Sequence, residues 1–254
     1  MDRIKAIILA AGEGKRMKSS TPKVLQEVCG IPMIEWAIQH VVDAGAEDII
    51  TVVGHRAEEI RQYIEQCRPV RDGLCTADFV YQLEQLGTGH AVMQAQPLIE
   101  DADETVFVVF GDMPLLRSET LSELYKYHRS NNNDVTLLTC ICADPYGYGH
   151  IVRDDEGRML RSVEEKDATP EEAAIKEVNT GVYCFETKKL VKALGLLNND
   201  NAQNEYYLTD TLEILRNLGD RVDAMMIEDE NEILGVNDQQ QLAKANEVMQ
   251  ARLA

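Results

Sequence analysis

The sequence has no apolar run long enough to cross a membrane, and its N-terminus lacks the pattern of a secretory signal. We therefore expect a cytoplasmic protein without a membrane partner. Basic residues are also few. The chain has 25 lysines and arginines and 44 aspartates and glutamates, so its formal net charge is −19. Such a field repels phosphate backbones, which argues against nucleic-acid binding.

The six cysteines are scattered along the chain, and no two of them form a C-x-x-C pair. Cys140 and Cys142 alternate within one apolar run, so they would share one face of a strand. This distribution argues against a zinc site or a disulfide framework. We expect reduced, mostly buried thiols.

Two common phosphate-binding motifs are missing. The Walker spacing G-x-x-x-x-G-K-[ST] does not occur, and Met17 stands where the dinucleotide fingerprint needs its third glycine. What is present is L-A-A-G-E-G-K-R-M from Leu9, directly after an apolar run at Ile4–Leu9 that predicts a buried strand. Its small residues, with Lys15 and Arg16, suit a nucleoside triphosphate. A strand-to-helix turn with surface lysines is the alternative that this loop alone leaves open.

Short β-like runs alternate with helical runs through the first 141 residues. The patterns predict strands at Ile4–Leu9, Asp48–Val53, Asp78–Gln82, Thr105–Phe110 and Asp134–Ile141, and helices at Pro32–Asp43, Ala57–Gln66, Thr88–Gln96 and Ser118–Ser130. Ser118 is the expected N-cap of the last helix. This alternation predicts an α/β fold with a Rossmann-like, mixed but mostly parallel sheet and helices on both faces.

After residue 141 the regular alternation of predicted strands and helices ends. Asp154-Asp155-Glu156-Gly157 predicts a hairpin turn between strands at His150–Arg153 and Met159–Glu164. Further strands are expected at Gly181–Phe185 and Val222–Ile227, and helices at Glu205–Asn217 and from Asn237 onward. We predict one domain with a nucleotide-binding lobe (1–141), a smaller, partly antiparallel lobe (142–236) and a C-terminal helix (237–254).

Chemically distinctive residues follow the predicted strands, where open α/β sheets bind ligands. Asp112 comes directly after the apolar strand at Thr105–Phe110, a position that suits a Mg²⁺ ligand; an Asx turn before Pro114 is the alternative. Gln82 ends another strand, and its amide can both donate to and accept from the edge of uracil. A polar strand end is the alternative for Gln82.

Several motifs occur together in one order. They are L-A-A-G-x-G-x-R-M with Pro22-Lys23, Q-L-G-T-G-H-A from Gln85, G-D-M-P-L from Gly111, Y-G-Y-G-H-I from Tyr146, V-E-E-K-D-A-T from Val163, N-T-G from Asn179, E-Y-Y-L-T-D from Glu205 and G-V-N-D from Gly235. Together they resemble the sugar-phosphate nucleotidyltransferase family, and most of all the uridyltransferase domain of bacterial N-acetylglucosamine-1-phosphate uridyltransferases. Two residues depart from that pattern: His150 replaces the usual arginine, and Asn204 the usual glycine.

The resemblance implies the nucleotide-diphospho-sugar transferase fold and a Mg²⁺-dependent reaction of UTP with N-acetylglucosamine 1-phosphate, giving UDP-N-acetylglucosamine and pyrophosphate. By this resemblance, Arg16 and Lys23 are catalytic, and Asp112 and Asn237 hold the metal. The nucleotide would contact Leu9, Ala10, Ala11, Gly12, Gln82, Gly87 and Thr88. The sugar phosphate would contact Gly111, Gly149, Glu164 and Asn179. A different sugar phosphate or nucleotide, or a non-catalytic nucleotide-sugar-binding module, are the alternatives.

Bifunctional members of this family carry a second, acetyltransferase domain built as a β-helix of hexapeptide repeats. The sequence shows no such repeat, so we expect no acetyl transfer. In the family that domain provides the trimer contacts. We therefore expect a monomer or weak dimer.

Overall fold

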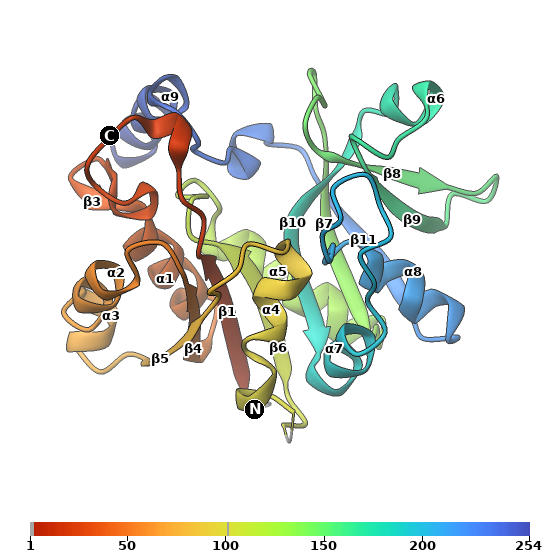
Figure 1. Cartoon of the computed structure of the whole chain (residues 1–254), viewed down its shortest axis with the longest axis horizontal. Coiled ribbons are helices and arrows are strands. Elements are labelled where there is room, and N and C mark those ends of the chain that lie inside the picture. The colour runs from red at the N-terminus through yellow and green to blue at the C-terminus, as the bar shows by residue number, and fades with distance from the viewer. Residues whose placement is uncertain (1–2, 101) are drawn as a thin grey trace.

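The computed structural model describes residues 3–100 and 102–254, which form a central twisted sheet with helices on both faces (Figure 1). Within this part the main sheet runs β11-β7-β10-β6-β1-β4-β5, and the hairpin β8-β9 joins it through β10. Its strands are β1 (Ile4–Ala10), β4 (Ala46–Val53), β5 (Thr76–Tyr81), β6 (Thr105–Phe110), β7 (Val135–Ile141), β8 (Gly149–Arg153), β9 (Met159–Glu164), β10 (Glu177–Glu186) and β11 (Val222–Ile227).

Most neighbouring strands are parallel, as predicted. β5, β4, β1 and β6 pair in parallel, and so do β11 and β7. The exception is β10, which lies antiparallel between β6 and β7. The expected hairpin is present, because β8 and β9 pair antiparallel and the Gly157 N–H donates to the Asp154 carbonyl across the turn at 2.9 Å.

Helices cover both faces of the sheet. The helices in the described part of the chain are α1 (Met33–Asp43), α2 (Ala57–Ile64), α3 (Arg68–Arg71), α4 (Thr88–Met93), α5 (Ser118–Ser130), α6 (Pro170–Ala173), α7 (Thr187–Leu194), α8 (Asp210–Asn217) and α9 (Gln239–Leu253). One apolar core joins the sheet to α1, α2 and α5, and a second joins the other face to α4, α7 and α8. β1 shows why: Ala6 and Ile8 point into the first core, whereas Ile7 and Leu9 point into the second.

A small hairpin of β2 (Glu27–Val28) and β3 (Ile31–Pro32) packs with α9 around a third apolar cluster, which includes Met33, Val236 and Met249. Short 3₁₀ turns lie at η1 (Lys15–Met17), η2 (Lys23–Leu25), η3 (Gln96–Leu98) and η4 (Glu230–Ile233). In the described part of the chain, no helix combines the length and apolar character that crossing a membrane requires.

Two local predictions were wrong. The helix expected at Glu205–Asn217 begins only at Asp210. Its first residues are held instead against the β5–α4 loop, because the Tyr206 N–H donates to the Leu86 carbonyl at 2.8 Å and the Leu208 N–H donates to Thr88 Oγ1 at 3.1 Å. Ser118 is the first residue of α5 rather than its N-cap, a position taken by Arg117.

The strands of the predicted second lobe do not form a separate sheet. β10 and β11 belong to residues 142–236, yet both pair within the main sheet, and only the β8-β9 hairpin projects from it. Residues 1–141 and 142–236 therefore share one sheet. The lobe boundaries themselves stay a prediction.

Candidate active site

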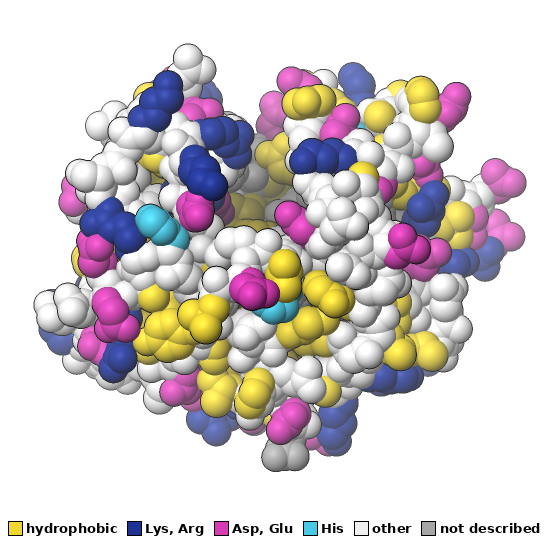
Figure 2. All heavy atoms as spheres, in the orientation of Figure 1, with side chains coloured by type: hydrophobic (Ala, Val, Ile, Leu, Met, Phe, Trp, Pro, Cys, Tyr) yellow, Lys and Arg dark blue, Asp and Glu magenta, His cyan; other side chains and the backbone are white. Residues whose placement is uncertain are grey.

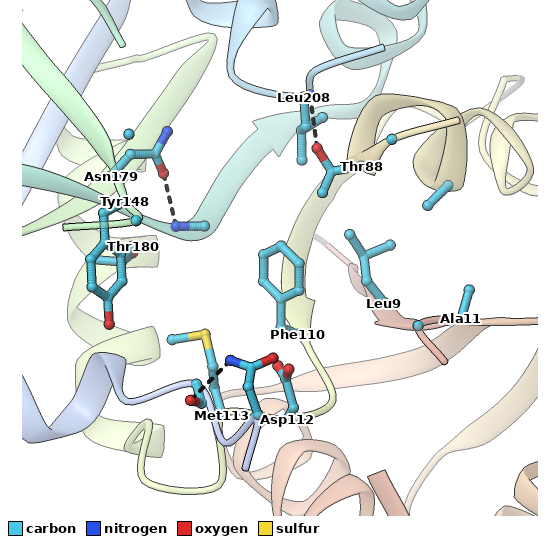
Figure 3. A pocket seen from close by; sticks show the side chains of 18 of the residues that line it. Leu9, Ala11, Thr88, Phe110, Asp112, Met113, Tyr148, Asn179, Thr180 and Leu208 are labelled. Carbon is cyan, nitrogen blue, oxygen red and sulfur yellow. Dashed lines mark hydrogen bonds between the residues drawn. The ribbon is translucent and has the colours of Figure 1, made fainter. Parts of the chain in front are cut away.

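A pocket of about 730 Å³ opens at the carboxyl ends of β1, β5 and β6. Figure 2 shows this face hollowed near the top centre, with lysine and arginine side chains along the left rim. All the predicted site residues except Gly111 line this pocket. In Figure 3, Phe110 lies between Leu9 and Thr88 on one side and Tyr148 and Asn179 on the other. We call the wall with Leu9 and Thr88 the nucleotide side and the wall with Tyr148 and Asn179 the sugar side, after the roles that the motifs predict.

The nucleotide side is made largely of main chain. Leu9 to Gly12 leave the end of β1 and line the pocket, and the Gln85 side chain donates to the Ala11 carbonyl at 3.2 Å. Gly87 has φ +103°, and a Cβ there would lie 2.6 Å from the Tyr206 carbonyl oxygen. Only glycine fits this position. The loop between β5 and α4, which contains Gly87, thus packs directly on the Glu205–Leu208 segment.

Gln82 is buried at the end of β5, with 3% of its surface exposed. Its Nε2 donates to the Gly87 carbonyl at 3.0 Å and lies 3.2 Å from His90 Nδ1. Burial holds such an amide in one orientation, because an unsatisfied buried donor costs about 1–3 kcal/mol.

Asp112 and Asn237 lie far apart in the sequence and converge on one cation. The Lys23 ammonium forms an ion pair with the Asp112 carboxylate and donates to Asn237 Oδ1 at 3.1 Å. The Val236 N–H donates to the Asp112 carbonyl at 2.9 Å, which fixes the two segments side by side. Lys23 and Asp112 side chains are each 13% exposed.

This donor set fits Mg²⁺. The cation prefers one or two carboxylates together with phosphate oxygens and water, and here one carboxylate and one amide oxygen already face a common positive charge. Asn237 Nδ2 donates to the Gly235 carbonyl at 3.2 Å, which leaves Oδ1 as the free end of the amide toward Lys23. Residues 3–100 and 102–254 contain no group of three His, Cys, Asp or Glu side chains that could hold a metal on their own. Substrate oxygens would therefore complete the site.

A second cavity of about 200 Å³ adjoins this point, lined by Glu13, Gly14, Lys15, Arg16, Lys23 and Asn237. The Lys15 ammonium is paired with Glu13 at 2.6 Å. Among the residues that the structure describes, none forms an ion pair with Arg16. Arg16 lines both cavities, and its guanidinium is available for an anion.

The sugar side carries polar side chains that already bond to one another. Thr209 Oγ1 donates to Glu164 Oε1 at 3.0 Å, and burial raises the pKa of the Glu164 carboxyl. Asn179 Nδ2 donates to Tyr183 Oη at 2.9 Å and to Ser162 Oγ at 3.2 Å, while Asn179 Oδ1 accepts from the Gly181 N–H at 2.8 Å. Asn179 thus shapes this wall, and its side chain has little bonding capacity left for a ligand.

Two residues from the sugar-phosphate motifs, Gly111 and His150, do not line the pocket. Gly111 lies outside the lining; its N–H donates to the Leu9 carbonyl at 3.0 Å, and Ile34 packs against its α-carbon. His150 is buried and also points away from the pocket, with Nδ1 2.9 Å from the Ile175 carbonyl and Nε2 2.9 Å from Glu165. The hydrogen bond from His150 lowers the pKa of Glu165. The neighbouring Gly149 does line the pocket.

Some lining residues were not predicted, among them Gln85, Phe110, Tyr148, Tyr183 and Thr209. Gln85 and Tyr148 belong to motifs that the sequence displays, so proximity to Gly87 and Gly149 was an available signal. Tyr183 and Phe110 gave none, because each reads as an ordinary apolar position in a strand.

The fold and pocket are those of a nucleotidyl transferase. A family model described as Nucleotidyl transferase matches residues 5–236, so the chain belongs to this family. A solved structure of UDP-glucose pyrophosphorylase complexed with UDP-glucose has the same fold, with a TM-score of 0.80 at 20% identity over 99% of this chain and 100% of that one.

The chain is similar over nearly its whole length to bacterial proteins named bifunctional protein GlmU. It is 47% identical to that of Acetivibrio thermocellus and 46% identical to that of Pelobacter propionicus, each over 100% of this chain and over 53% and 54% of the relative. For Lactobacillus delbrueckii subsp. bulgaricus the identity is 48%, over 97% of this chain and 52% of the relative. The chain spans about half the length of these curated relatives. The family predicted from the motifs is confirmed.

Proposed function

We propose that this chain transfers a uridylyl group from UTP to N-acetylglucosamine 1-phosphate, giving UDP-N-acetylglucosamine, a cell-wall precursor, and pyrophosphate. The convergence of Asp112 and Asn237 on the Lys23 ammonium supports this most directly. It concentrates a metal-holding pair and a cation between the nucleotide side and the sugar side of one pocket. The family and the GlmU relatives favour the same reaction. Because UTP is a cytoplasmic metabolite, the reaction belongs to the cytoplasm.

The nucleotide lies along the loop from Leu9 to Gly12, with its base toward Gln82, Gly87 and Thr88. Its phosphates then extend toward Arg16 and Lys23, the two cations that line both cavities. Main-chain contacts bring the phosphates close at little entropic cost, and the cations neutralise their charge.

The chemical step is an in-line displacement. A non-bridging oxygen of the sugar phosphate bonds to the α-phosphorus of UTP, the bond from that phosphorus to the oxygen shared with the β-phosphorus breaks, and pyrophosphate leaves with that oxygen. The attacking phosphate is already anionic near neutral pH, so no general base is needed. Arg16 and Lys23 stabilise charge on the transferring and leaving phosphates. Mg²⁺, held by Asp112 and Asn237, supplies further charge neutralisation when bound.

The sugar is held by Glu164 and by the main chain at Gly149 and Asn179, which line the far wall. The Glu164 carboxylate, oriented by Thr209, accepts hydrogen bonds from sugar hydroxyls. A carboxylate of this kind, withdrawn from water, discriminates strongly in favour of a ligand that satisfies it.

A pyrophosphate-release screen tests the proposal. Purified protein is offered UTP, CTP, ATP or dTTP with N-acetylglucosamine 1-phosphate, glucose 1-phosphate or glucosamine 1-phosphate, with Mg²⁺ or with EDTA. We expect release only with metal, fastest with UTP and N-acetylglucosamine 1-phosphate, and a product of the mass of UDP-N-acetylglucosamine. A faster reaction with another pair would overturn the assigned substrates. Nucleotide-sugar binding without release would make the chain a binding module.

A further inference from the structure

Gln82 could in principle turn either end of its amide toward a nucleobase, and the two orientations would select different bases. The edge of uracil presents an N3–H donor between two carbonyls, whereas N3 of cytosine is an acceptor. An amide oxygen facing the base therefore favours uracil, and an amide nitrogen favours cytosine. What fixes the orientation of this one amide fixes the choice of base.

Two neighbours hold the nitrogen end of Gln82. The Gly87 carbonyl, 3.0 Å from Nε2, can only accept a hydrogen bond, so the amide atom that faces it is the nitrogen. The second amide hydrogen is directed to His90 Nδ1 at 3.2 Å. With both hydrogens engaged inside the protein, Oε1 is the atom left to meet a ligand, and Gln82 lines the pocket. In the described part of the chain, Oε1 makes no hydrogen bond.

This arrangement requires a particular form of His90. For Nδ1 to accept from Gln82, the neutral ring must carry its proton on Nε2. Gln94 faces Nε2 from the other side, with its own Nε2 3.2 Å away and donating to the His90 carbonyl at 2.9 Å. The two amides thus compete for one acceptor, because a neutral imidazole has only one.

Burial decides this competition. Gln82 is 3% exposed, so leaving one of its amide hydrogens without a partner costs the full desolvation penalty. Gln94 lies at the end of α4 and is only partly buried, so its amide can turn toward water. The proton therefore belongs on Nε2 and the acceptor on Nδ1. The ring is further held near Tyr206, with the two centroids 6.3 Å apart.

We propose that His90 is a positioning residue that locks the Gln82 amide with its oxygen toward the base and so selects uracil over cytosine. The inference rests on the proposed function only in that UTP is the nucleotide. His90 itself does not line the pocket, so it acts through Gln82.

Three variants separate this role from a purely structural one. His90→Phe keeps a ring but removes the acceptor, and the ratio of kcat/KM for UTP to that for CTP should fall about 10-fold. His90→Asn places an oxygen near the position of Nδ1 and should keep the ratio within about 3-fold of the original. Gln94→Ala is the matched control and should leave the ratio unchanged. An unchanged ratio in His90→Phe, or an Asn variant that behaves like Phe, would overturn the inference.

Two readouts do not depend on turnover. Calorimetry with UDP and CDP measures the same preference in binding, so a protein that prefers UDP but releases no pyrophosphate contradicts the proposed function alone. A long-range ¹H–¹⁵N spectrum reports the histidine tautomers, with the His90 signal assigned by its absence in His90→Asn. We expect the neutral Nε2–H form near pH 8. The Nδ1–H form would overturn the inference, whether or not the Phe variant folds.

Discussion

The two sides of the pocket hold their polar groups in opposite ways. On the sugar side, Asn179 makes three hydrogen bonds within the protein, and Glu164 is bonded to Thr209. On the phosphate side, the part of the pocket at Arg16 and Lys23 where we propose that the phosphates bind, Arg16 lines two cavities and has no ion-pair partner among the described residues. Lys23 there contacts Asp112 and Asn237, the two residues expected to hold a metal. The sugar wall is therefore built before a ligand arrives. On the phosphate side, Lys23 would have to leave Asp112 and Asn237 when the phosphates and the metal bind.

Removing the charge at the centre of the phosphate side should have the largest effect. Asp112→Asn keeps the shape of the side chain but removes the charge that pairs with Lys23 and that Mg²⁺ needs. We expect pyrophosphate release to fall about 1,000-fold, equivalent to ~4 kcal/mol. Asp155→Asn, in the exposed β8-β9 turn, is the control, and circular dichroism checks the fold. Activity close to that of the unmodified protein would reject Asp112 as a metal ligand.

On the sugar side the main loss should be one of stability. Asn179→Ala removes three hydrogen bonds and leaves the Gly181 N–H and Tyr183 hydroxyl without their partner in a buried place. We expect unfolding in urea to become easier by about 3 kcal/mol. Ser162→Ala removes only one of these bonds and should cost less than half as much. Equal losses in the two variants would mean that Asn179 does not organise this wall.

Arg16→Ala tests the phosphate side without touching a packed residue, because Arg16 is exposed. Because the guanidinium would act on charge that develops in the transition state, we expect kcat to fall about 100-fold while KM for UTP changes little. Arg16→Lys should recover only a small part of the lost activity, since the point charge of an ammonium group does not reproduce the planar set of donors on a guanidinium. Lys18→Ala, on an exposed residue outside both cavities, serves as the control. A change confined to KM would make Arg16 a ground-state binder.

The smallest expected effect lies beside the sugar wall, at Asp210. Burial, with the neighbouring charges of Glu164, Glu213 and Asp167, raises the pKa of Asp210 to about 6 from 3.8. The folded protein then binds a proton that the unfolded chain releases, so this group lowers stability as pH rises between about 4 and 6. Asp210→Asn should therefore stabilise the protein at pH 8 by about 1–2 kcal/mol and give almost no gain at pH 4. Urea unfolding at both pH values measures this, and a gain independent of pH would contradict it.

The sequence predicted what depends on local pattern. The short apolar runs of β1 and β6 predicted buried strands. The carboxyl ends of those strands then indicated the place of the pocket, because parallel strands share one carboxyl edge. Most of the lining residues belong to the quoted motifs, but fewer than half of them were predicted as site residues. The family resemblance, and not periodicity, gave their roles.

What the sequence did not predict depends on contacts between distant segments. Nothing local prevents Glu205–Thr209 from being helical; the hydrogen bonds from Tyr206 and Leu208 to the β5–α4 loop do. The three internal bonds of Asn179 and the contact between Gln82 and His90 are likewise visible only once the chain is folded. The helix α7 is an exception, because it was missed although its apolar residues, Leu190, Ala193 and Leu194, show the local helical spacing that would have predicted it.

The position of β10 has a consequence for how the protein is made. The ribosome synthesises β6 and β7 before β10, the strand that pairs with both of them in the folded sheet. Until then β6, with the sequence T-V-F-V-V-F, has one unpaired edge in an almost wholly apolar strand. Such an edge readily pairs with another chain. Between the synthesis of Phe110 and that of Glu186, the nascent protein is therefore exposed to aggregation through β6, and a chaperone that covered this edge would protect it.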